Sequence, residues 1–179
     1  GTHLSDFRLV RPVFRNGEVF CYLASVGHWH DVGGNVPGNY NPQATESFQE
    51  GMLIPPVKLF EAGILKTDIV AILSANSRLP NSLYGDMNAQ INALDLGHQR
   101  LADLLDEYGE GEVATALALL RARADRMMRD HLAALPDGTI SVEDYLDNDG
   151  VNDDVLTLAV DMTINGDRLT IDFSRSSPA

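Results

Sequence analysis

The sequence predicts an α+β fold in three successive parts: an N-terminal β-hairpin with a long loop, a central antiparallel helical hairpin, and a C-terminal antiparallel β-meander. Three observations predict this order. β-branched and aromatic residues crowd the first 26 positions, and apolar residues recur every three or four positions between 84 and 134. The last third then holds two short apolar runs around a turn signal.

The N-terminal part reads as a hairpin followed by irregular chain. Residues 8–14 and 18–26 have the composition of strands, and Arg15-Asn16-Gly17 between them is a turn signal. Pro12 places the first strand at a sheet edge, because proline has no N–H to donate. Residues 27–56 are rich in Gly, Pro and Asn, and irregular stretches of this length are usually functional or disordered.

Helical periodicity begins near position 67. Residues 67–77 predict a short helix, and residues 84–108 and 111–134 predict two longer ones. Gly109-Glu110-Gly111 separates the long helices, so we expect them to form an antiparallel pair that packs through its apolar stripes. These stripes include Leu101, Leu117 and Leu120.

The last third returns to strand patterns. Residues 139–145 alternate weakly, and residues 156–164 and 168–173 read as strands. Asn165-Gly166-Asp167 between the last two is a strong hairpin signal, so the three strands predict a meander.

Composition limits the classes of function. The chain has 179 residues, 44% of them apolar, which suits one domain with a real core. Its net charge of −13 argues against nucleic acid or an anionic membrane surface as the partner. No apolar run is long enough for a membrane-spanning helix, and the single cysteine, Cys21, predicts a reducing, cytoplasmic setting.

The densest polar cluster directly follows the second predicted strand. If the strand geometry continues, His28 and His30 share one face and Asp31 takes the other. Two imidazoles on one face are a start for a Zn, Mn or Fe site. The alternative is a hairpin end with solvent-exposed histidines.

His3 and Asp6 form a second cluster, whose spacing of three places both side chains on one side of a turn. The two clusters bracket the predicted hairpin, and closing a hairpin brings its ends together. We therefore expect His3, Asp6 and His28 to come within reach of one ion. Such a set leaves coordination positions open, as a catalytic metal requires.

Other polar groups have more than one interpretation. Arg78 could clamp a carboxylate, or it could pair with Asp86 at a helix start. Asp147-Asn148-Asp149-Gly150 lacks the ligand spacing and terminal Glu of a calcium loop, so we interpret it as a solvated acidic turn. The sequence contains neither a G-x-x-x-x-G-K loop nor a G-x-S-x-G elbow.

A series of short motifs runs along the whole chain: Gly1-Thr2-His3-Leu4-x-Asp6, Gly27-His28-Trp29-x-Asp31-x-Gly33-Gly34, Pro37-Gly38, Glu50-Gly51, Ile54-Pro55-Pro56, Asn76-x-Arg78-x-Pro80, Gly85-Asp86-x-x-Ala89-Gln90, Leu135-Pro136-Asp137-Gly138, Asp147-x-Asp149-Gly150 and Asp172-Phe173. Taken in this order, they resemble the hydantoinase B/oxoprolinase family. The resemblance implies that residues 1–179 are a single fragment of a longer domain, truncated at both ends.

The resemblance also implies a site and a partner. The family's His-Asp-His metal ligands fall on His3, Asp6 and His28, for a divalent Zn, Mn or Fe ion. Asp31 and Arg78 are the candidate catalytic residues, with Asp31 orienting a ligand histidine from behind. ATP-Mg is expected on an actin-like A-type partner subunit of a hetero-oligomer, not on this chain.

Three functions follow from the resemblance. The first is part of the B-type subunit of an ATP-dependent amidohydrolase that opens a cyclic amide such as a hydantoin or 5-oxoproline. In that reaction the partner phosphorylates the amide oxygen, and the metal helps water to attack. The second is a subunit of an acetone- or acetophenone-type carboxylase. The third is a metal-stabilised interaction module without turnover.

Overall fold

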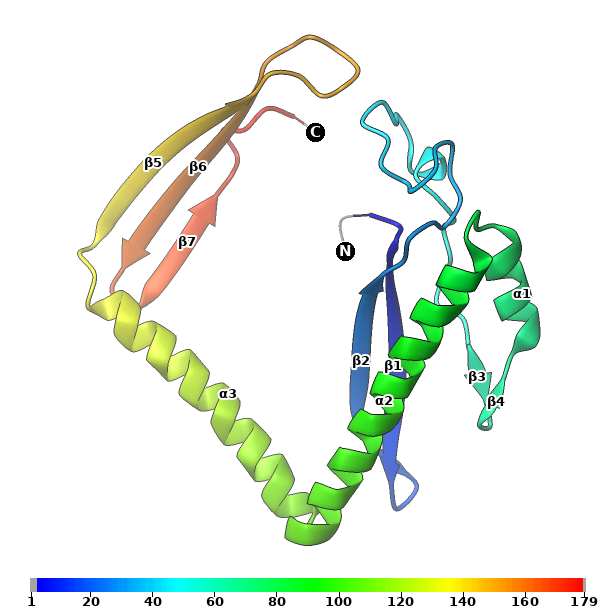
Figure 1. Cartoon of the computed structure of the whole chain (residues 1–179). Coiled ribbons are helices and arrows are strands. Elements are labelled where there is room, and N and C mark those ends of the chain that lie inside the picture. The colour runs from blue at the N-terminus through cyan, green and yellow to red at the C-terminus, as the bar shows by residue number, and fades with distance from the viewer. Residues whose placement is uncertain (1–2, 179) are drawn as a thin grey trace. The chain divides into compact units, whose positions relative to one another are not determined.

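The structure is a computed structural model that describes residues 3–178. Gly1 and Thr2, which open the first motif, therefore lie outside the described residues. The chain divides into two compact units, Gly1–Asp103 and Leu104–Ala179, which we describe separately. Its helices and antiparallel strands confirm the predicted α+β class (Figure 1).

The first unit begins with the predicted hairpin. β1 (Asp6–Arg15) pairs antiparallel with β2 (Glu18–His28), and Asn16 and Gly17 form the turn between them. Both turn residues have positive φ, 50° and 84°, as a type I′ turn requires, and this turn matches the twist of the flanking strands. The turn pairs Arg15 with Glu18, and a β-bulge between Val13 and Phe14 shifts the register by one residue, so the first residue of β1 lies directly opposite the last residue of β2.

The predicted irregular stretch contains little regular structure. A short 3₁₀ turn covers Ser47–Gln49, and the strands β3 (Phe60–Glu61) and β4 (Ile64–Leu65) form a small hairpin after it. The helix α1 (Thr67–Ala75) follows, close to the predicted bounds.

The long helix α2 (Pro80–Tyr108) starts on a proline, which is favourable at a first helical position because the N–H there has no partner inside the helix. The core of this unit lies between α1, α2 and the residues that follow β2. Its fully buried members are Trp29, Val32, Leu73, Leu83 and Met87. Phe7 of β1 stacks on the Trp29 ring at 3.8 Å between centroids, which joins the hairpin to this core.

The second unit contains the helix α3 (Glu110–Ala133) and a three-stranded sheet of β5 (Gly138–Leu146), β6 (Leu156–Asn165) and β7 (Arg168–Asp172). The strand order is β5-β6-β7, so the predicted meander is confirmed.

The two long helices are present, but the predicted burial of their facing stripes is not found. Leu117 and Leu120 of α3 are 45% and 62% exposed, and Leu101 of α2 is only half-buried. Residues 3–178 therefore do not bury the apolar stripe of α3. The spacing predicted the helix correctly but not what covers it, because periodicity indicates an apolar face without identifying its partner.

Among the described residues, no helix is both long enough and apolar enough to cross a membrane.

Candidate metal centre

The hairpin register brings the two predicted clusters together. Asp6 and His28 are Cα partners at the open end of β1 and β2. His3 lies three residues before Asp6 in a turn, where the Asp6 N–H donates to the His3 carbonyl at 3.2 Å. The convergence that the sequence predicted for these three side chains is confirmed, and it follows from the closed hairpin together with the bulge that sets Asp6 opposite His28.

The ligand atoms are close enough to share one ion. One atom from each of His3, Asp6 and His28 lies within 4.8 Å of the other two. Asp6 Oδ1 is 2.8 Å from His28 Nδ1 and 3.8 Å from His3 Nε2, and the two imidazole rings meet edge to face at 5.1 Å. The Asp6 side chain is 19% exposed and the two histidines about 40%, so the cluster is open to solvent on one side.

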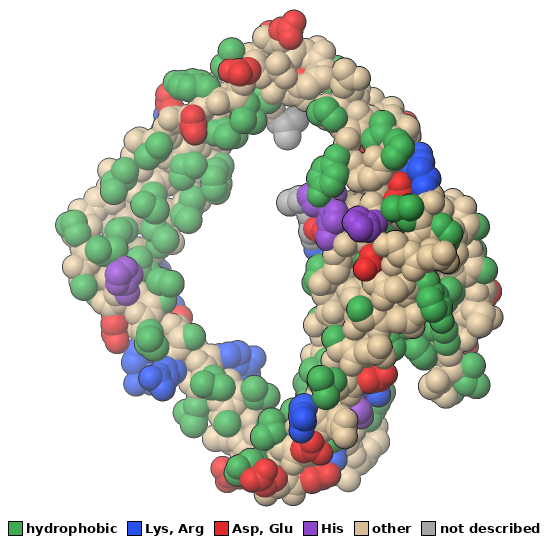
Figure 2. All heavy atoms as spheres, viewed as in Figure 1, with side chains coloured by type: hydrophobic (Ala, Val, Ile, Leu, Met, Phe, Trp, Pro, Cys, Tyr) green, Lys and Arg blue, Asp and Glu red, His purple; other side chains and the backbone are tan. Residues whose placement is uncertain are grey.

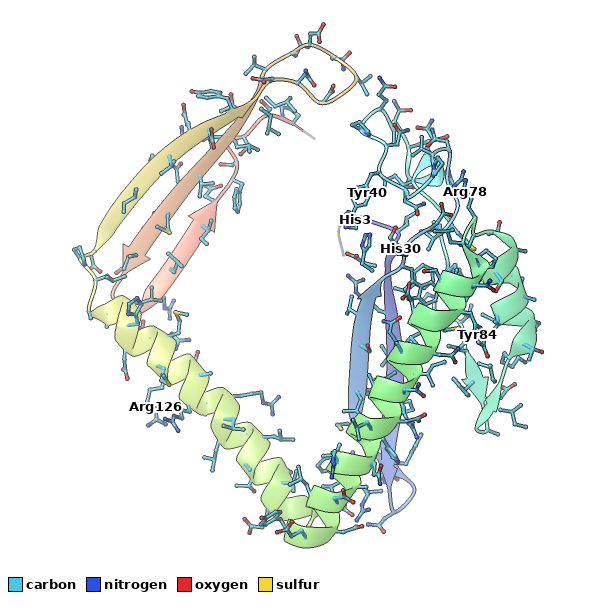
Figure 3. All side chains as sticks on the ribbon, viewed as in Figure 1. His3, His30, Tyr40, Arg78, Tyr84 and Arg126 are labelled. Carbon is cyan, nitrogen blue, oxygen red and sulfur yellow. The ribbon has the colours of Figure 1, made fainter. Side chains whose placement is uncertain are left out.

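Tyr40 is a member of this cluster that the sequence analysis missed. Its hydroxyl lies 3.2 Å from His28 Nε2, and its ring centroid is 5.8 Å from the rings of both His3 and His28. Figure 3 shows Tyr40 beside His3. The residue sits in the long loop, where its Asn-Tyr-Asn context indicates only a turn, so no local pattern could connect it to the hairpin end.

His30 does not join the cluster, contrary to the interpretation that places it on one face with His28. β2 ends at His28, so the strand alternation does not continue to residue 30. The His30 Nδ1 atom instead lies 3.0 Å from the Ser82 hydroxyl at the start of α2. Only the cross-hairpin set of three remains as a metal-ligand candidate among residues 3–178.

Asp31 and Arg78, the two candidate catalytic residues of the sequence analysis, pair with each other. Asp31 is 2% exposed, and its carboxylate accepts the N–H groups of Gly33, Gly38 and Arg78 at 3.0–3.1 Å. The Arg78 guanidinium donates to the same carboxylate at 3.1 Å and to the carbonyls of Gly33, Gly34 and Val36. Four N–H donors therefore occupy the carboxylate oxygens that the sequence analysis expected to orient a ligand histidine. The carboxylate that Arg78 contacts is Asp31, whereas the sequence offered Asp86 as its partner.

The environment of Asp31 keeps it ionised. Burial raises the pKa of this carboxyl, but the backbone N–H donors of Gly38, Arg78 and Gly33, with the Arg78 side chain, outweigh burial and lower the pKa from 3.8 to about 2. The buried charge is thus stabilised by four donors, and its function is to fix the loop of residues 31–38.

A cavity of about 400 Å³ opens beside the cluster. His3 and His28 line it on the hairpin side, and Tyr40 and Asn41 line it on the loop side, with Glu50 at its wall. A second hollow, of about 700 Å³, starts at His3 and Asp6 and continues over apolar side chains of β1 and of residues 52–59. Figure 2 shows histidines grouped on this part of the surface.

The acidic turn at residues 147–150 contains no ligand cluster among the described residues. Asp149 accepts the backbone N–H groups of Val151 and Asn152 at 2.8 and 2.6 Å, which lowers its pKa. Its oxygens accept hydrogen bonds from within the turn, as is typical of an aspartate in a turn.

The family model for hydantoinase B/oxoprolinase matches residues 1–179, the whole length of the chain. The chain belongs to the hydantoinase B/oxoprolinase family. The resemblance drawn from the motifs is therefore confirmed.

Relatives in this family have different reactions in their names. The chain is 38% identical to caprolactamase subunit beta of Pseudomonas jessenii over 93% of its own length and 29% of that protein. It is 28% identical to 5-oxoprolinase 1 of Arabidopsis thaliana, over 99% of this chain and 16% of that protein. It is 27% identical to the acetophenone carboxylase delta subunit of Aromatoleum aromaticum, over 99% of this chain and 26% of that protein. The chain thus spans less than a third of these relatives.

The fold agrees with a solved structure. The crystal structure of the ATP-dependent caprolactamase from Pseudomonas jessenii matches with a TM-score of 0.86 and 37% identity, over 96% of this chain and 30% of that one.

Proposed function

We propose that this chain forms the metal-binding part of the B-type subunit of an ATP-dependent enzyme that opens a cyclic amide. The observation that carries the proposal is the convergence of His3, Asp6 and His28 at the open end of the hairpin. The similarity to a caprolactamase beta subunit and to a 5-oxoprolinase supports the reaction class, with a lactam, a hydantoin or 5-oxoproline as the kind of substrate.

The residues fit a divalent transition metal. Two imidazole nitrogens and one carboxylate oxygen suit Zn, Mn or Fe, whereas Ca²⁺ prefers six or more oxygens. A bound ion of this kind supplies Lewis-acid polarisation of an oxygen at neutral pH. His3, Asp6 and His28 would hold it, and the carboxylate would offset part of its charge.

The surroundings of the site also suit a small ring substrate. The cavity of about 400 Å³ beside His3 and His28 lies in the size range of small-molecule sites. Its wall supplies polar groups from Asn41 and Glu50 for an amide, and the neighbouring apolar hollow can take the methylene part of a ring. These residues would bind and orient the substrate against the ligand cluster.

The proposal assigns ATP to a different polypeptide. The sequence has no G-x-x-x-x-G-K loop, and the related caprolactamase chain is named as a subunit. We assign ATP-Mg to an actin-like A-type subunit that phosphorylates the amide oxygen, so the enzyme would be a hetero-oligomer.

A carboxylase is the second candidate, because the acetophenone carboxylase delta subunit is also a relative. Supplying the full complex with ATP and either a panel of cyclic amides or a ketone with bicarbonate separates the two. Metal binding without either activity would favour a non-catalytic module.

The test of the site is His28→Ala in the full-length protein with its partner. Removing one of three ligands should lower the bound metal, measured by elemental analysis after dialysis, from about one equivalent to near zero. Turnover should fall more than the ~10–100-fold typical of outer-shell changes. ATP binding should stay intact, because this chain does not hold the nucleotide.

His131→Ala is the matched control, since it removes an exposed histidine of α3 outside the cluster. It should retain the wild-type metal content and turnover. If His28→Ala also retained both, the ligand assignment would be wrong.

A further inference from the structure

Tyr40 makes contacts that a surface tyrosine does not need. Tyr40 is 69% exposed, so packing in the core does not hold it in place. Yet its hydroxyl lies 3.2 Å from His28 Nε2, and its ring lies over His28 at 24° between planes. An exposed aromatic that is aimed at a candidate metal ligand calls for an explanation.

The loop is built to hold Tyr40 at this point. Asn39, its neighbour, is 8% exposed and has a φ of 67°, in the left-handed region that asparagine tolerates better than most residues. Its side-chain oxygen accepts the Val32 N–H at 2.9 Å, and its amide donates to the carbonyls of Gly33 and Glu50 at 2.6 and 2.7 Å. The residue before Tyr40 is therefore fixed by three hydrogen bonds.

The Asp31–Arg78 pair fixes the other side of the same loop. Asp31 accepts the Gly38 N–H, and Arg78 donates to the Val36 carbonyl. The two residues that sequence reasoning placed in the chemistry thus support the segment that carries Tyr40.

The two nitrogens of His28 have different partners. Nδ1 lies 2.8 Å from Asp6 Oδ1, on the side where His3 converges, and Nε2 points to the Tyr40 hydroxyl. An ion among the three ligands would therefore take Nδ1 and leave Nε2 for Tyr40. A ligand histidine usually donates its other ring N–H to a neighbouring acceptor, which fixes the orientation of the ring.

We propose that Tyr40 is the positioning residue for His28, and that its hydroxyl holds the ring through a change of tautomer. This inference rests on the proposed metal site. Without the ion, the Nδ1–H of a neutral ring donates to Asp6, and Nε2 accepts the Tyr40 O–H. With the ion on Nδ1, the proton lies on Nε2 and is donated to the Tyr40 oxygen. A hydroxyl can serve both states because it both donates and accepts, whereas a backbone carbonyl could serve only the second.

The test is Tyr40→Phe in the full-length protein with its partner subunit. This variant keeps the ring and removes only the hydroxyl. The dissociation constant for Zn²⁺, measured by competition with a chromophoric chelator, should rise by about 10–100-fold. The Co²⁺-loaded variant should show a shifted visible spectrum, which a merely structural role would not produce. The melting temperature of the metal-free protein should stay the same, because the ring is exposed.

Tyr22→Phe is the matched control, because Tyr22 is a 66% exposed tyrosine on β2. It should bind Zn²⁺ as the wild type does. If Tyr40→Phe keeps the wild-type dissociation constant while His28→Ala loses the metal, the inference about Tyr40 is overturned and the metal site stands. If the wild-type protein binds no Zn²⁺, both fall.

Discussion

At the scale of single residues, the same type of side chain has different surroundings at the two places where the sequence analysis expected chemistry. Asp6 is partly exposed and faces two imidazoles, whereas Asp31 is buried and surrounded by N–H donors. The sequence shows both as acidic residues three positions after a histidine. Only the number of donors around each carboxylate separates a candidate metal ligand from a structural anchor. Sequence spacing predicted that Asp6 meets two histidines, and it did not indicate the donors around Asp31.

The anchor has a measurable dependence on pH. Because the folded pKa of Asp31, about 2, lies below its ordinary value of 3.8, its charge stabilises the fold above pH 4, and this contribution is lost as the pH falls from about 4 to about 2. A difference of this size corresponds to about 2 kcal/mol. Asp31→Asn should therefore lower the unfolding free energy by about that amount at pH 7, measured by urea denaturation.

The difference from wild type should shrink as the pH falls from about 4 to about 2, because the carboxyl of the unfolded wild-type chain takes up a proton first and that of the folded chain follows. Asp153→Asn, in the exposed acidic loop, is the control and should change stability by less than ~0.5 kcal/mol at either pH. A constant deficit for Asp31→Asn down to pH 2 would show that its charge is not the stabilising feature.

At the scale of elements, local patterns located the helices α1 to α3 and every strand except the two-residue strands β3 and β4, but they could not show how these elements dock. The Asn16-Gly17 turn closes the hairpin, so the approach of the two polar clusters at its ends could be predicted, whereas the bulge that places His28 opposite Asp6 could not. The contact between α2 and the hairpin could not be predicted from these local patterns either. It depends on Gln90, which donates to the carbonyls of Phe7 and Ser25 at 3.1 Å and accepts the Trp29 indole N–H at 2.8 Å. The periodicity of a helix does not indicate that one of its polar residues bonds to Phe7 on β1, Ser25 on β2 and Trp29 just after β2.

Gln90 explains why glycine occupies position 27. A Cβ on Gly27 would lie 2.8 Å from the Gln90 side-chain carbon, closer than real contacts allow. Gln90→Leu should cost about 2–4 kcal/mol, because it leaves buried polar groups without a partner at about 1–3 kcal/mol each. Thermal unfolding measures this loss.

Gln99→Leu, on an exposed position of the same helix, should stay within ~0.5 kcal/mol of wild type. Gly27→Ala should also destabilise, and less so in a Gln90→Ala background where the clash is removed. Additive effects in that double-mutant cycle would contradict the contact.

At the scale of the whole molecule, many large apolar side chains of the described residues are exposed. In the second unit, Ile140, Met162 and Ile171 lie in register across β5, β6 and β7, and Val142 continues the same face. Ile140, Val142 and Ile171 are 57%, 58% and 51% exposed. Alternation in the sequence predicts such a face, but a sequence that spans under a third of its relatives cannot show what covers it.

This face should make the isolated chain of residues 1–179 associate, because large exposed apolar patches favour association. Its net charge of −13 opposes that association, and salt screens the charge, so the association should strengthen between 0.01 and about 0.15 M salt. Sedimentation velocity over a range of concentrations measures both effects.

Val142→Thr with Ile171→Thr should restore the monomer, since threonine keeps the β-branched shape that strands favour while removing apolar area. Thr170→Ser, on the opposite face of β7, should associate as the parent chain does. A parent chain that stays monomeric at every salt concentration would show that this face does not drive association, and equal association of the double variant would place the contact on another surface.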